Sequence, residues 1–293
     1  MSHPIFNEFR GWSGPRPANI SIDWIGARFL GHWDKQPDIP ACNPYAPPVP
    51  EINEEYFEWV DILESVKAAS GRYVMAELGA GYGRWGIRAG IAAMQAGLKD
   101  IHLVFAEAEP QHCAWIREAV KMNGVAQFSS FFDVAVNYEG KPVPFLISYE
   151  DLKADNWWGQ CIAWESGATE IEGETYHGRQ VYRTPAGYKQ VYVTPGVVEE
   201  VLAGHKRIDL VDMDLQRAEQ DVMRHSMPIL NQTVKRIHIG THAPEIEDEL
   251  RVAFQKAGWR IVWDFKCNSL NQTPYGPVEF VDGIQSWINT KID

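Results

Sequence analysis

The stretch "ELGAGYGRWG", residues 77–86, decides the fold of this 293-residue chain. It follows the β-rich apolar run "RYVMAEL" at 72–78 and precedes a helical pattern that Gly97 closes. A glycine loop between a buried strand and a helix is where open α/β sheets bind their ligands. We therefore expect this loop to lie at the carboxyl end of a parallel strand and to contact a ligand.

Strands and helices alternate on both sides of this loop, which predicts a doubly wound, mostly parallel sheet with helices on both faces. The last two β-rich runs, 259–265 and 278–288, have no helix between them and should pair antiparallel. The expected fold class is therefore α/β, a Rossmann-like seven-stranded sheet with an antiparallel terminal strand. The other expected strands are 72–78, 100–110, 128–136, 207–214 and 234–240, and the expected helices begin near 53, 84, 111, 194 and 243, with a weaker one after 214.

Two segments interrupt this pattern. Residues 1–50 are rich in proline, glycine and aromatic residues, so we expect an irregular arm that either packs on the domain or covers a substrate cleft. The domain would then span 51–293. Within it, an insertion at about 138–190 reads as short strands and loops that form a lid or a substrate wall. Its tryptophans, Trp157, Trp158 and Trp164, either pack inside the insertion or grip an acceptor.

Composition narrows the class of protein. The net charge of −12 disfavours nucleic acid and anionic membranes as partners, and no apolar run approaches the roughly 18 residues of a membrane span. The first residues do not resemble a secretory signal. Four widely spaced cysteines without a C-x-x-C pair indicate reduced thiols and a cytoplasmic protein. The expected partner is a small molecule, and a homo-oligomer is compatible with this composition.

The glycine stretch fits two motifs with different ligands. Residues 81–86 match G-x-G-x-x-G, a dinucleotide motif that places pyrophosphate on a helix N-terminus. Residues 77–83 match acid-x-G-x-G-x-G, the opening loop of S-adenosylmethionine (SAM) methyltransferases. SAM has no phosphate but carries an α-ammonium group and a sulfonium, so the carboxylate of Glu77 favours the second motif. We expect Glu77 and the loop residues Gly79, Ala80, Gly81 and Gly83 to bind the amino-acid part of SAM.

Two further carboxylates are candidates for the nucleoside. Glu107 lies at the end of the second strand, where either nucleotide fold places an acid that accepts from ribose hydroxyls. Glu109 competes for this role if the register slips by two. Asp133 ends an aromatic strand where the adenine edge should lie, and it is either an adenine ligand or a turn residue. Gly86 falls inside the following helix, where close packing on the strand explains it.

With these motifs the chain resembles the FkbM-type methyltransferases, a class I SAM-dependent family. The resemblance covers roughly 72–265 and implies the class I methyltransferase fold, with SAM as cofactor. Four positions depart from the family pattern: Asp212, Gln216, Arg217 and Gly240 stand where the family has Lys, Glu, Gly and Glu. The matching segments are 77–83, 107–110, 122–124, 135–136 with Gly140 and Phe145, 209–219, 240–242 and 258–259.

The acceptor side offers two candidate catalytic residues. Asp214 ends a buried parallel strand, and His242 follows the next strand at the same rim. An imidazole with an ordinary pKa of about 6.5 could take a hydroxyl proton at neutral pH, whereas the alternative is a surface histidine before Pro244. Asp212 lies two residues before Asp214, so both point to one face as a metal-binding or pKa-coupled pair. We predict no metal, and we expect His238 to be a structural core residue.

The predicted function is SAM-dependent methyl transfer to an oxygen of a sugar or a secondary metabolite, with general-base assistance. His242 or Asp214 would be the base or the acceptor anchor. Two alternatives stay open at this point. One is an NAD-dependent oxidoreductase that uses the 81–86 motif, and the other is a SAM-binding protein that transfers no methyl group.

Overall fold

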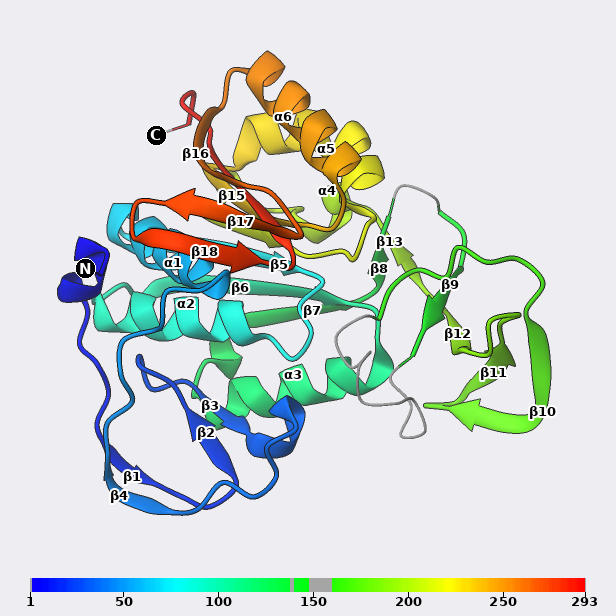
Figure 1. Ribbon diagram of the computed structural model, residues 1–293, viewed down its shortest axis with the longest axis horizontal. Helices are drawn as coiled ribbons and strands as arrows, with labels where there is room; N and C mark the ends of the chain where they lie inside the picture. Colours follow the sequence, from blue (N-terminus) through cyan, green and yellow to red (C-terminus); the bar gives the residue numbers. More distant parts are fainter. Residues whose placement is uncertain (1, 138–139, 148–159, 293) are drawn as a thin grey trace.

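A seven-stranded sheet forms the centre of the computed structural model, which describes residues 2–137, 140–147 and 160–292. The strand order is β16-β19-β15-β14-β5-β6-β7 (Figure 1). The neighbouring pairs from β15 to β7 are parallel, and β19 runs antiparallel between β15 and β16. This is the Rossmann-like fold of class I methyltransferases with an antiparallel terminal strand, as predicted. The strands are β5 (Arg72–Leu78), β6 (Asp100–Glu107), β7 (Ser129–Asp133), β14 (Leu210–Met213), β15 (Arg236–Thr241), β16 (Arg260–Phe265) and β19 (Gly283–Ile288).

Helices cover both faces of the sheet (Figure 1). On one face, α1 (Glu55–Ala68), α2 (Arg84–Gln95) and α3 (Pro110–Met122) bury their apolar sides in one hydrophobic cluster. On the other, α4 (Val198–Val201), α5 (Glu219–Thr233) and α6 (Pro244–Ala257) form a second cluster. The helix after β14, expected to be weak, runs for 15 residues with Pro228 inside it. Because the helices cover the two faces of the sheet, the carboxyl ends of the strands stay available to form a site.

The N-terminal region is more regular than the sequence predicts. It contains two short antiparallel pairs and two 3-10 helices, because an edge strand of three or four residues can accommodate a proline, as Pro15 and Pro44 show. Its aromatic residues are buried against the domain: Trp33 is fully buried, stacks on Trp115 of α3 at 5.7 Å and contacts Tyr82 of the glycine loop. The elements are η1 (Pro4–Glu8), β1 (Gly14–Arg16), β2 (Ile20–Ile22), β3 (Arg28–Leu30), η2 (Gly31–Asp34) and β4 (Cys42–Tyr45).

The insertion folds as a separate small antiparallel sheet beside the main one (Figure 1), in the order β10-β11-β12-β9. Its strands are β9 (Val143–Leu146), β10 (Thr169–Tyr176), β11 (Arg179–Arg183) and β12 (Lys189–Val193). The short parallel pair of β8 (Ala135–Val136) and β13 (Pro195–Gly196) connects it to the main domain. Trp164 is 62% exposed, and the positions of Trp157 and Trp158 lie outside the described residues.

A hairpin corrects the prediction for the last β-rich run. Residues 278–280 belong to β18 (Gly276–Phe280), which pairs with β17 (Ser269–Thr273), and only 283–288 enter the main sheet. The antiparallel pairing of 259–265 with the end of the chain is confirmed, because β16 pairs with β19. A short 3-10 helix, η3 (Ala126–Phe128), precedes β7. Among the described residues, we find no helix with the length and apolar character needed to cross a bilayer.

Candidate functional site

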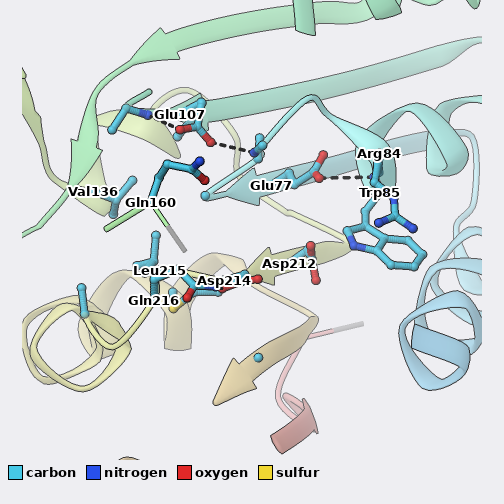
Figure 2. Close-up of a pocket in the computed structure, with 18 of the residues that line it drawn as sticks. Glu77, Arg84, Trp85, Glu107, Val136, Gln160, Asp212, Asp214, Leu215 and Gln216 are labelled. Carbon is cyan, nitrogen blue, oxygen red and sulfur yellow. Dashed lines mark hydrogen bonds between the residues drawn. The ribbon is translucent and has the colours of Figure 1, made fainter. Parts of the chain in front are cut away.

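A pocket of about 340 Å³ opens at the carboxyl ends of the parallel strands. The glycine loop, the ends of β6 and β14, and the insertion all contribute to its lining (Figure 2). Glu107, Val136 and Gln160 lie toward one end of this view, and Asp212 lies toward the end of Arg84 and Trp85. Its size is within the range of small-molecule sites. None of the described residues 2–50 lines it, so this part of the chain packs on the domain rather than covering the pocket.

The glycine loop adopts a backbone conformation and a close approach to β14 that a residue with a side chain could not adopt. Gly79 has a φ of +81°, and a Cβ there would lie 1.8 Å from the carbonyl oxygen of Asp214. This close approach brings the end of β5 against the end of β14 and shapes the pocket floor. Gly86 differs, because it lies inside α2 and a Cβ there would lie 2.5 Å from the Phe105 ring. Gly86 is therefore a packing glycine, as the sequence indicates.

Glu77 is 2% exposed and holds the N-terminus of α2. Its Oε1 accepts the backbone N–H of Trp85 at 3.2 Å, and its Oε2 accepts that of Gly86 at 2.8 Å (Figure 2). Burial and the neighbouring Asp212 raise the pKa of Glu77 well above its ordinary value, although these two amides oppose the shift. The N–H groups that a pyrophosphate would use at a helix N-terminus are thus occupied by a carboxyl group of this chain.

Glu107 lines the pocket at the end of β6 and organises the loop around it. Its Oε2 accepts the N–H of Gly81 at 2.6 Å, and its Oε1 accepts those of Ala108 and Glu109 at 2.8 and 2.7 Å. Burial raises the pKa of Glu107 to about 8. Its competitor Glu109 does not line the pocket, because it caps α3 through the N–H of His112 and accepts from the Tyr176 hydroxyl.

Asp133 lies elsewhere than expected, and its adenine role is corrected here. Although it is the register partner of Glu107 on the next strand, its side chain is 48% exposed and pairs with Arg117 of α3 at 2.8 Å. Side chains alternate along a strand, so Asp133 shares the α3 side with Phe131, over whose ring Arg117 lies. The pocket wall beside Glu107 is formed instead by Val134, Ala135 and Val136.

A group of three side chains that we call the Asp212 cluster lines the pocket near Glu77: Glu58 of α1, Asp212 of β14 and His238 of β15. Each offers one polar atom, and these atoms lie within 4.8 Å of one another. Glu58 and Asp212 are hydrogen-bonded, and burial raises the pKa of Asp212 to about 6 and that of Glu58 well above its ordinary value. The sequence does not single out Glu58, because an acid in the first turn of an amphipathic helix is usually a solvated charge.

A second group, the Asp214 cluster, consists of Asp214, Glu219 of α5 and His242. His242 is 8% exposed in its side chain and lies between carboxylates, with Nδ1 2.9 Å from Glu219 and Nε2 3.3 Å from Asp214. A third carboxylate, Asp282, is 3.8 Å from Nε2. Glu219 also accepts the N–H groups of Leu215 and Arg217, so it fixes the turn after β14.

This environment corrects the prediction for His242. Burial alone would lower the pKa of His242, but its contacts with Asp214 and Glu219 raise it to about 11. The imidazole is therefore charged at neutral pH and cannot accept a proton, and His242 does not line the pocket. Asp214 does line the pocket, and contact with His242 outweighs burial and lowers the pKa of Asp214.

Comparison with known proteins finds a sequence relative that is named as a methyltransferase. No family model matches the chain. A protein of Jannaschia sp. (strain CCS1) named "Putative methyltransferase" is 27% identical over 210 residues, which cover 71% of this chain and 69% of that protein. This relative supports a methyltransferase.

Solved structures resemble the chain only distantly. An O-methyltransferase from Bacillus cereus in complex with SAH (S-adenosylhomocysteine) shares 10% identity at a TM-score of 0.41, over 82% of this chain and 84% of that one. Methyltransferase FkbM from Methylobacillus flagellatus KT shares 8% identity at a TM-score of 0.44, over 75% of this chain and 44% of that one. At these values the likeness does not bear on activity, and FkbM-type specificity stays a prediction.

Proposed function

We propose that this protein is a SAM-dependent methyltransferase that acts on a hydroxyl group of an uncharged sugar or secondary metabolite. The observation that carries the choice of cofactor is the contact of Glu77 with the first amides of α2. A dinucleotide would place its pyrophosphate at these amides, beside a carboxyl group that already accepts from them. SAM brings no phosphate to this position.

The pocket residues fit the parts of SAM. Gly79, Ala80 and Gly81 line the part of the pocket where the amino-acid part would lie, and Glu107 presents a carboxyl group where ribose hydroxyls would donate. Val134 to Val136 supply an apolar wall for adenine, and Arg84 lines the end where the SAM carboxylate would lie. When bound, SAM supplies the activated methyl group for an in-line displacement.

Asp214 is the residue we propose to hold the acceptor. It is ionised at neutral pH, half of its side chain is exposed, and Gln216 donates to it at 3.0 Å. An acceptor hydroxyl could donate to the same carboxylate and so be oriented for transfer. Glu54 and Asp282 line the same pocket, so an acceptor with phosphate or carboxylate groups would be repelled, which favours an uncharged one. His242 would act through Asp214, as a positioning residue.

Isothermal titration calorimetry with SAH and with NADH tests the cofactor. We expect SAH to bind and NADH not to bind. Glu107→Gln should weaken SAH binding about tenfold, because the amide replaces one of the two accepting oxygens with a donor that cannot accept from the ribose or from the loop amides. Its register partner provides the matched control, because Asp133→Asn changes a carboxylate outside the pocket and should leave the affinity unchanged. Binding of NADH but not SAH would overturn the proposal.

Methyl transfer itself requires a separate assay. The enzyme would be incubated with SAM and a panel of hydroxylated sugars and secondary metabolites, and the products would be examined by mass spectrometry for one added methyl group. Tight SAH binding without any methylated product across the panel would favour a protein that binds SAM without transferring its methyl group.

A further inference from the structure

The imidazole of His238 in the Asp212 cluster is held in one orientation by a hydrogen bond on the side of the ring away from the pocket. Nδ1 of His238 lies 2.7 Å from Oδ2 of the fully buried Asp61, whose Oδ1 accepts from Arg236 at 2.6 Å. Because a carboxylate that pairs with a guanidinium accepts, Nδ1 carries the proton that lies between His238 and Asp61. Nε2 is then the ring nitrogen that faces Glu58 and Asp212, and within the described part of the chain it has no hydrogen-bond partner. His238 is 3% exposed.

The two carboxyl groups in front of this imidazole must share a proton. Glu58 and Asp212 are hydrogen-bonded to each other, and two ionised carboxylates cannot form such a bond. Asp212 is 3% exposed, so water stabilises a second negative charge poorly there. The pair therefore holds one proton in the empty pocket, as coupled carboxyl pairs do elsewhere.

The charges around the pair also favour a cation. Glu55 and Asp61 of α1, Asp214 beyond β14 and Glu77 of β5 add acidic groups, while Arg84 of α2 opposes them. Glu77 itself is occupied by the amides of α2, so it is not the free acceptor that the sequence suggested. Three acceptor atoms therefore converge at the end of the pocket next to the glycine loop.

We propose that Glu58, Asp212 and His238 form a preformed ammonium site, in which the α-ammonium group of SAM displaces the proton shared by the two carboxyl groups. This inference rests on the proposed SAM-dependent function. An ammonium group has three N–H donors, which match two carboxylates and Nε2 of His238 in number. The displaced proton passes to solvent, so that binding of the cofactor releases about one proton.

Calorimetry with SAH in buffers of different ionisation enthalpy measures this release. We expect about one proton to be released near pH 7, and the affinity for SAH to rise by up to about tenfold per pH unit through the titration of the pair. 5′-Methylthioadenosine lacks the amino-acid part of SAH and serves as the second probe. It should bind with little proton release and with little dependence on pH.

Substitutions of the two carboxyl groups test whether the released proton is the one that they share. Glu58→Gln and Asp212→Asn should each abolish most of the release and weaken SAH binding about tenfold or more, while binding of methylthioadenosine stays unchanged and shows that the pocket is folded. Glu54→Gln is the matched control. This residue lines the same pocket just before α1 but accepts from the N–H of Val281, so the release should persist.

Three results would overturn the inference, and they are distinguishable. SAH binding without proton release would remove the ammonium site and leave the proposed function standing. Failure of SAH to bind would remove the proposed function as well. Elemental analysis that finds a divalent metal in the purified protein, lost in Glu58→Gln, would make the cluster a metal site instead.

Discussion

The Asp212 cluster and the Asp214 cluster contain the same groups, two carboxyls and one imidazole: in each, one carboxyl and the imidazole come from β14 and β15 or their ends, and the second carboxyl comes from a helix. In the first, the imidazole of His238 is hydrogen-bonded to a carboxylate outside the cluster, Asp61. The two carboxyls of the cluster then face the pocket with one shared proton. In the second, the imidazole of His242 lies between the carboxylates and is charged. The partner of the imidazole therefore decides the state of each cluster. Where a separate carboxylate binds the imidazole, the two cluster carboxyls can bind a ligand; where the cluster carboxylates bind it themselves, they form an ion pair with it.

Removing the support of His238 should have the largest effect. Asp61→Ala leaves the buried Arg236 with Glu64 alone and frees the His238 ring. We expect a loss of about 3–5 kcal/mol in the free energy of unfolding, the usual result of breaking a buried charge pair. Urea denaturation measures it, with Glu64→Gln, which removes the more exposed partner, as the milder control. A loss below about 1 kcal/mol would show that Asp61 does not hold the first cluster.

The charged state of His242 predicts a pH-dependent stability. Because its folded pKa is raised from 6.5 to about 11, the folded state binds this proton more tightly than the unfolded state. The contribution is fully present below pH 6.5 and is lost as the pH rises toward 11. Urea denaturation should therefore find His242→Gln clearly less stable than the wild type at pH 6 and closer to it at pH 10. A difference that does not change with pH would mean that His242 is not an imidazolium.

The smallest effects should have opposite signs in the two clusters. The pKa of Asp212 is raised to about 6, so its ionised form costs stability above that pH, and Asp212→Asn should stabilise the empty protein at pH 7 by about 1–2 kcal/mol. The pKa of Asp214 is lowered, so Asp214→Asn should destabilise, by less than about 1 kcal/mol because the side chain is half exposed. Thermal unfolding of both variants at one pH is the measurement. Shifts of the same sign would contradict the distinction between the clusters.

The sequence predicts the parts of this molecule that depend on local pattern. The strand before the glycine loop, the closure of α2, α3 and α6 near glycines, and the antiparallel final strand follow from periodicity and turn residues. Gly79, Ala80, Gly81 and Glu107 line the pocket for the same reason, because they lie at strand ends, whereas Gly83 is the N-cap of α2 and does not line it.

Other features depend on contacts between distant segments, and the sequence alone does not reveal them. Glu58 meets Asp212 only because α1 packs on the sheet, 154 positions away in the chain (212 − 58). The pKa of His242 depends on Glu219 and Asp214, so its ordinary value misleads. Asp133 shares the face of its register partner Glu107, but its pairing with Arg117 of α3 holds it outside the pocket, and a strand-end argument does not include this contact.

A crystal structure with bound SAH tests the central claim most directly. The expected complex has the ribose hydroxyls at Glu107, the adenine against Val134 to Val136, and the amino group between Glu58 and Asp212, while Glu77 stays on the amides of Trp85 and Gly86. An amino group bound by Glu77, with the first turn of α2 released from it, would contradict the division of roles between these carboxylates. SAH bound away from the glycine loop would contradict the proposed function.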